Sequence, residues 1–395
     1  MHRANDVLWP TRVARSVLQA HAEGTLIAQY GLVERAWPAA LPAVPATRLG
    51  VQANYLTDLG VRGMDEAAVF LAEHLKLQEL PEAGEPVERL VAAEWAARHA
   101  TGEHSDTDLC AVIDAQVCFA GAWATARELV SAVLESGAPL RSPGALLYAA
   151  VVAGGDANPP VADELFKLAG KAAPREADAL LVALRQAAYT LKRRARPQEA
   201  LTLLAELVRD AGDAERRRAL SPADAATVRA LAMNLEALAL LKSGRHDDAY
   251  KTVRHALTAI PREGWVLIDR DAGFRYRCQI RTNVAQMQFK RGDPAAAVRT
   301  LDDNLAENRV DHPESVGETL SIAAYFHYRE QDFARALELI SEAYRLIRLE
   351  GAPDRLRGCR KIAVAALHCG GRATEAEQVL RRVERDPLGF DEEVH

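Results

Sequence analysis

The 395-residue sequence has few of the features that mark secreted or membrane-spanning proteins. Its five cysteines are odd in number and scattered, so we expect reduced thiols rather than a disulfide framework. No run approaches the roughly 18 apolar residues of a membrane helix, and Met1 to Gly24 lacks the apolar core of a signal peptide. These absences predict a cytoplasmic protein that does not enter a membrane.

Sequence motifs for catalysis and metal binding are also missing. There is no CxxC, HExxH or GxSxG pattern. The one Gly-Lys pair, Gly170-Lys171, is followed by Ala172 instead of the Ser or Thr that a phosphate-binding loop needs. Nothing in the sequence therefore indicates convergent catalytic groups. We expect a protein that is not an enzyme and that needs no metal or cofactor.

The charge balance excludes a nucleic-acid binder that relies on overall charge. The chain holds 55 acidic and 49 basic residues, which gives a net charge of -6 and an isoelectric point near 6.0. Its content of 49% hydrophobic and 26% charged residues is typical of a folded soluble protein. Strand-like alternation of any length is absent, so the fold is predicted to be all-α.

What the sequence does contain is an internal repeat, clearest between Ala230 and Pro261. Ala237, Gly244, Ala249, Ala256 and Pro261 follow one another at steps of 7, 5, 7 and 5 residues. The small alanines let two antiparallel helices approach closely, the glycine makes the turn between them, and the proline ends the second helix. These spacings resemble the tetratricopeptide repeat.

Further stretches repeat this pattern with variations. The matching positions are Ala188, Ala195, Ala200 and Leu207; Ala285, Gly292 and Ala297; Ala324, Gln331, Ala336 and Ala343; Gly371, Ala376 and Val383; and, more weakly, Gly63, Ala68, Gly121, Ala126, Val133 and Ala162. Alanines of the second helices recur at steps of 49, 48, 39 and 40 residues, whereas the family's usual period is about 34. Longer helices or inserted connections are therefore expected, similar to the repeats of bacterial sensor and regulator proteins.

The resemblance implies an all-α, right-handed superhelical solenoid of antiparallel helical hairpins, with about seven or eight units. We predict an N-terminal helical cap over residues 1–45 and a degenerate repeat with a linker over 46–100. Weakly matching repeats would follow over 101–175 and well-matching repeats over 176–386. Residues 387–395 form an acidic tail.

In this family the first helix of each repeat lines a concave groove. Twenty positions fall on that face in the last five repeats, and none of them is Asp or Glu. The residue types resemble the carboxylate clamp of peptide-binding members, so the predicted ligand is an acidic peptide or protein segment. The acidic tail makes self-association a further expectation. The candidate peptide-binding residues are Arg185, Tyr189, Lys192, Arg193, Asn234, Lys242, Gln286, Phe289, Lys290, Tyr325, Tyr328, Arg329 and Lys361.

Two alternative functions stay open from the sequence. Leu49 to Gly63 also resembles the recognition half of a phage-repressor helix-turn-helix, which would make the protein a peptide-sensing transcriptional regulator. Three prolines between residues 38 and 45 occupy the space of the preceding helices, and the stretch is poor in basic residues, so we do not expect DNA binding. The other alternative is a structural subunit that binds through its convex face.

Overall fold

The computed structural model describes residues 86–379, apart from 115–122, 156–157, 265–266, 268–269, 312, 314–315, 351–352 and 377. The described residues form helices joined by short turns and loops and contain no β-strand. They divide into two compact units, one of residues 139–304 and the other of residues 86–138 together with 305–379. The predicted cap, the helix-turn-helix stretch and the acidic tail lie outside the described residues.

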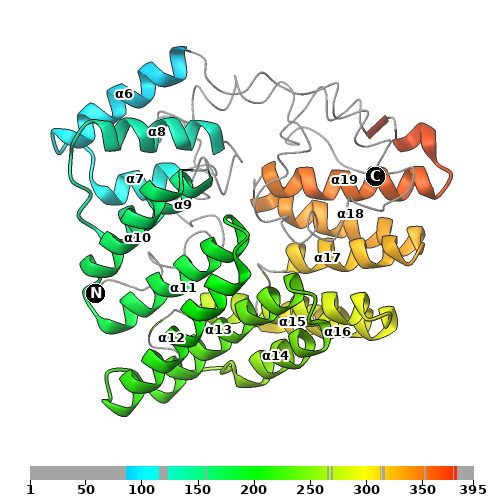
Figure 1. Cartoon of the computed structure of the whole chain (residues 1–395). Coiled ribbons are helices and arrows are strands. Elements are labelled where there is room, and N and C mark those ends of the chain that lie inside the picture. Colours follow the sequence, from blue (N-terminus) through cyan, green and yellow to red (C-terminus); the bar gives the residue numbers. More distant parts are fainter. Residues whose placement is uncertain are drawn as a thin grey trace. The chain divides into compact units, whose positions relative to one another are not determined.

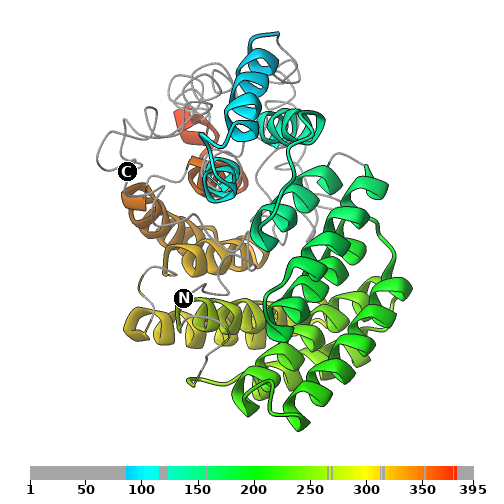
Figure 2. The ribbon, with the colours of Figure 1, turned by 90° about the vertical axis from the view of Figure 1, so that its left-hand side faces the viewer.

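The first unit is a series of helical hairpins (Figures 1 and 2). Consecutive helices from α9 to α15 pack together, and α9, α11, α13 and α15 also contact one another in turn. A hydrogen bond from the Thr300 hydroxyl to Gln288 Oε1 at 2.8 Å joins α16 to α15. We call these odd-numbered helices first helices and their partners second helices. The helices are α9 (Pro143–Gly155), α10 (Pro159–Ala172), α11 (Glu176–Lys192), α12 (Pro197–Arg216), α13 (Pro222–Lys242), α14 (His246–Ala259), α15 (Arg270–Lys290) and α16 (Pro294–Asp311), of which α16 continues into the second unit.

The second unit repeats this packing in its C-terminal part. There α17 packs on α18, α18 packs on α19, and the first helices α17 and α19 contact each other. In its N-terminal part α6 packs on α8. The helices are α6 (Pro86–Ala100), α7 (Asp106–Asp114), α8 (Trp123–Glu135), α17 (Val316–Arg329), α18 (Phe333–Glu350) and α19 (Pro353–Cys369). The predicted all-α fold of antiparallel hairpins is confirmed.

Small residues lie where the helices of a hairpin meet, as the repeat predicts. The alanines at positions 200, 237, 249, 256, 285, 297, 324, 336, 343 and 376 are all fully buried. Ala188 departs from the pattern, because it is partly exposed while Ala187 is fully buried. A shift of one residue turns a helix face by about 100°. The side of α11 that faces its neighbours is therefore offset from the predicted one.

The turn inside each hairpin uses a left-handed backbone conformation. The predicted turn glycines Gly244, Gly292 and Gly371 have φ angles of 79°, 83° and 78°. The residues that replace glycine at the same position, Ala195 and Gln331, have φ angles of 51° and 63°. Five hairpins thus end their first helix in the same way, which confirms the repeat spacing. At two of them a side chain occupies a conformation that favours glycine.

The long repeat period has two structural causes. The helices α12 and α13 are extended, with 20 and 21 residues. The connection between α14 and α15 carries an insert, and a hydrogen bond holds this insert against the first turn of α13. The backbone N–H of Leu267 in this insert donates to Asp224 Oδ1 at 2.8 Å, and both residues are buried. Both expected causes, longer helices and inserted connections, are therefore present.

The left-handed turns generate a stability prediction. Replacing Gln331 with Gly removes the cost of a side chain at positive φ, so Gln331→Gly should raise the free energy of unfolding by about 1 kcal/mol. Gly244→Ala should lower it by about the same amount, since a Cβ there has open space but an unfavourable φ. Chemical denaturation measures both changes. If both variants were neutral, the left-handed turn would not be the conformation in solution.

Candidate functional site

Lysines recur at the end of successive first helices in the first unit. Lys192, Lys242 and Lys290 are the last residues of α11, α13 and α15, and all three side chains are exposed. Arg193 follows Lys192 and is exposed as well. A cation in this position is favourable, because the C-terminal end of a helix carries partial negative charge. Three hairpins therefore present a basic residue at the same place on the same edge.

The deeper inner positions of these helices are filled by the protein itself. Tyr189 and Asn234 are buried, with 5% and 8% of their surface exposed. The Arg185 guanidinium donates to the Tyr276 hydroxyl at 3.1 Å and so joins α11 to α15, two hairpins along. The Asn283 amide donates to Asn234 Oδ1 at 2.8 Å and joins α15 to α13. The first helices thus lie close enough to pack their inner side chains against one another.

Partly exposed apolar side chains accompany the lysines. Phe289 directly precedes Lys290, Leu241 directly precedes Lys242, and both apolar residues are partly exposed. Gln286 lies on the same face of α15, and its Nε2 is buried without a hydrogen-bond partner among the described residues. Leu241 was not among the predicted site residues, although its position next to Lys242 on the helix could have indicated it. The open part of this face therefore combines cations with apolar surface.

Tyr189 packs toward the preceding hairpin. Its ring centroid lies 5.3 Å from that of Phe166, and its ring occupies the space beside Gly154 of α9. Burial, and to a smaller extent the Asp163 carboxylate, raises the pKa of the Tyr189 phenol. In the described part of the chain the phenol oxygen has no hydrogen-bond partner. Tyr189 thus belongs to the packing between α9, α10 and α11.

This packing predicts opposite effects for two helical glycines. A Cβ at Gly154 would lie 2.2 Å from the Tyr189 ring, so Gly154→Ala should destabilise the protein by about 1–3 kcal/mol despite alanine's higher helix propensity. Gly170 of α10 has open space, so Gly170→Ala should stabilise by about 0.5–1 kcal/mol. Thermal unfolding monitored by circular dichroism compares the two. Stabilisation by both would mean that the Tyr189 ring does not fill the space beside Gly154.

A half-buried carboxylate on α13 makes stability depend on pH. Burial raises the pKa of Glu236 above its ordinary value of 4.5, and Arg245 opposes this shift. A raised folded-state pKa means that the group's contribution to stability is full below the unfolded-state pKa. That contribution is lost as the pH rises through the folded-state pKa.

Glu236→Gln should therefore raise stability at pH 7, because the variant has no charge to desolvate. Below about pH 4 wild type and variant should converge, since the carboxyl is then protonated in both states. Urea denaturation at the two pH values measures the difference. Glu206→Gln, an exposed site on α12, controls for the loss of one surface charge. A stability gain from Glu236→Gln that is the same at both pH values would contradict the prediction.

In the second unit the candidate tyrosines are also packed inside. Tyr325 and Tyr328 of α17 are 5% and 7% exposed. The partly exposed Arg329 donates from Nη1 to the Tyr325 hydroxyl at 3.1 Å. The Tyr328 hydroxyl lies 3.8 Å from Cys369 Sγ of α19. Lys361 is on α19, and its side chain lies outside the described residues. These tyrosines contribute to the contact between α17 and α19.

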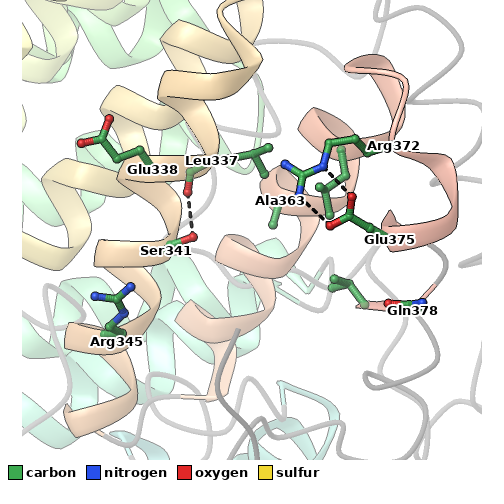
Figure 3. Close-up of a pocket in the computed structure, with 10 residues that line it drawn as sticks. Leu337, Glu338, Ser341, Arg345, Ala363, Arg372, Glu375 and Gln378 are labelled. Atoms are coloured by element: carbon green, nitrogen blue, oxygen red, sulfur yellow. Dashed lines mark hydrogen bonds and ion pairs between the residues drawn. The ribbon is translucent and has the colours of Figure 1, made fainter. Parts of the chain in front are cut away.

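A pocket of about 350 Å³ lies in the second unit between α18, α19 and residues 372–379 (Figure 3). One wall comes from α18, where the Ser341 hydroxyl donates to the Leu337 carbonyl at 2.7 Å. The opposite wall carries Arg372 and Glu375. Buried apolar side chains of α19 and of residue 379 complete the lining. No sequence pattern predicts this pocket, because its lining comes from three separate segments.

The described helices and their packing define a helical repeat protein of tetratricopeptide-like architecture. No model of a known protein family matches the sequence, and no curated protein matches it. Among solved structures, the chain is similar to a signal transduction ATPase with numerous domains from Pyrococcus horikoshii, a protein with a tetratricopeptide repeat sensor. That match has 11% identity and a TM-score of 0.45, and it covers 81% of this chain and 50% of that protein.

Neither a membrane-spanning helix nor a metal-binding group stands out in the described part of the chain. None of the helices there is both long and apolar enough to cross a bilayer. The same residues hold no cluster of three or more His, Cys, Asp or Glu side chains arranged to bind a metal ion.

Proposed function

We propose that the protein is a non-enzymatic interaction protein of the cytoplasm that binds an acidic peptide or protein segment along the ends of α11, α13 and α15. The observation that supports this proposal is the recurrence of an exposed lysine at the last residue of three successive first helices. A repeat that places a like charge at one edge three times gives an extended acidic segment several contacts of the same kind.

The physical chemistry of such a site requires several weak contacts. An exposed ion pair contributes about 0–1 kcal/mol, so Lys192, Arg193, Lys242 and Lys290 must act together. Leu241 and Phe289 add apolar contact area beside the cations. Gln286 lies on the same face of α15, and its side-chain carbonyl can accept a hydrogen bond from a peptide backbone. The role of Arg185, Tyr189 and Asn234 would be indirect. These residues lie in the packing between hairpins and would hold the first helices at a fixed spacing. In the second unit Arg329 is the last residue of α17, and Lys361 lies in the middle of α19, as Arg185 does in α11.

A second candidate function is binding through the side of the second helices, as in a structural subunit. The observation that favours it is the pocket of the second unit, because α18 and residues 373–376 both belong to second helices. This pocket has an apolar floor and a polar rim, which is the usual composition of a binding site.

The acidic-segment proposal can be tested by reversing charge on the lysines. A library of random peptides displayed on phage would select ligands, and the tightest would be measured by fluorescence anisotropy at two salt concentrations. We expect selected peptides rich in Asp and Glu, with affinity that falls as salt rises. Lys242→Glu with Lys290→Glu should weaken binding about tenfold, which corresponds to about 1.4 kcal/mol.

The matched control reverses two exposed basic residues of second helices, Lys251→Glu in α14 and Arg299→Glu in α16. This variant carries the same change in net charge, and we expect its affinity to stay within twofold of wild type. Equal losses in the two double variants would show that overall charge, rather than the ends of the first helices, determines binding. Selected peptides without acidic residues would also contradict the proposal.

A further inference from the structure

Among the described residues, the pocket between α18 and α19 offers one charged side chain without an ion-pair partner. On its rim Glu338 pairs with Arg335 at 2.6 Å. Arg372 and Glu375 form a two-bond ion pair at 2.6 and 2.5 Å. Arg345 lines the same pocket and is exposed, and within the described residues it forms no ion pair or hydrogen bond. Among the described lining residues, Arg345 is therefore the one cation that an incoming acidic group can pair with.

The floor of the pocket is apolar. Ala363 and Leu367 of α19 and Val379 are buried, and Leu337 of α18 lies beside them. A volume of about 350 Å³ is at the lower end of the range for ligand pockets, which suits one or two large side chains. A complementary ligand thus carries an apolar side chain directly next to carboxylates.

The acidic tail of this chain has that composition. Residues 387–395 contain Leu388 and Phe390, followed by Asp391, Glu392 and Glu393, and they hold no lysine or arginine. The tail is also tethered close by, because Val379 lines the pocket and Phe390 follows eleven residues later. Eleven residues span at most about 36–40 Å when fully extended, which leaves ample length to turn back.

We propose that residues 387–395 dock in this pocket of their own chain, with Phe390 on the apolar floor and the three carboxylates beside Arg345. The short tether raises the local concentration of the tail to the millimolar range, so a weak contact suffices for occupancy. This inference does not depend on the peptide site at the ends of α11, α13 and α15, since it involves other residues.

Limited proteolysis of the full-length protein tests the docking. Chymotrypsin cleaves after Phe390, and mass spectrometry follows the release of residues 391–395. We expect release from wild type to be at least threefold slower than from Arg345→Glu, because the reversed charge repels the tail. Arg299→Glu, an exposed arginine on α16, should match wild type. Equal release rates from all three proteins would overturn the proposal.

A charge exchange checks that Arg345 acts on the tail directly. Arg345→Glu combined with Asp391→Lys and Glu392→Lys should restore slow release, whereas the two tail substitutions alone should accelerate it. Failure of the combined variant to recover would overturn the assignment of Arg345.

Two further outcomes separate this docking from other modes. Docking within one chain makes the release rate independent of protein concentration. A rate that falls with concentration would instead show binding to a second copy and overturn the proposal. Lys242→Glu with Lys290→Glu should leave the rate unchanged. Faster release from that variant would place the tail on the first helices and overturn docking in the pocket.

Discussion

The close approach of two antiparallel helices at alanine is the constraint on which the rest of the structure depends. Ala237 and Ala249 are fully buried where α13 and α14 meet, and the equivalent alanines of the other well-matching repeats are fully buried too, except that Ala187 replaces Ala188 in α11. A larger side chain would force the helices apart, because protein interiors have no spare volume. The alanines therefore fix which side of each first helix faces its partner. The side of the first helix that faces away from its partner is fixed as a consequence. The position of its last residue, which is Lys242 in α13, is fixed in the same way.

The same close approach accounts for the crowded inner face. First helices of neighbouring hairpins contact one another, so side chains between them are buried instead of lining an open groove. Arg185 reaches Tyr276 past an intervening hairpin, and Asn234 is bonded to Asn283. In α11, α13 and α15 the last residue, a lysine, is exposed beyond this packing, whereas Tyr328 near the end of α17 is buried. The packing of the first helices thus sets where these lysines lie.

The repeat spacing was predictable because it reflects local chemistry. Small residues recur where helices meet, and the turn position takes a left-handed conformation even where Gln331 replaces glycine. The burial of Tyr325 and Tyr328 could not be predicted in the same way. Helical periodicity gives the face on which a side chain lies, but not how closely the next hairpin approaches that face. The pocket was equally hidden, since residues 337–345, 363–367 and 372–379 are brought together only by folding.

The net charge of the chain does not describe the charge at its hairpin turns. Each turn joins the C-terminal end of a first helix to the N-terminal end of a second helix, and these two ends carry opposite partial charges. The C-terminal end of a first helix favours cations, and the adjacent N-terminal end of a second helix favours anions. Acids at the start of α14 accordingly pair with nearby arginines, as Arg245 does with Asp248 at 2.8 Å and Arg291 does with Asp247. These pairs neutralise most of the turn. Lys242 lies on the first helix, and in the described part of the chain it has no ion-pair partner. A chain with a net charge of -6 can therefore still present exposed lysines at the ends of its first helices.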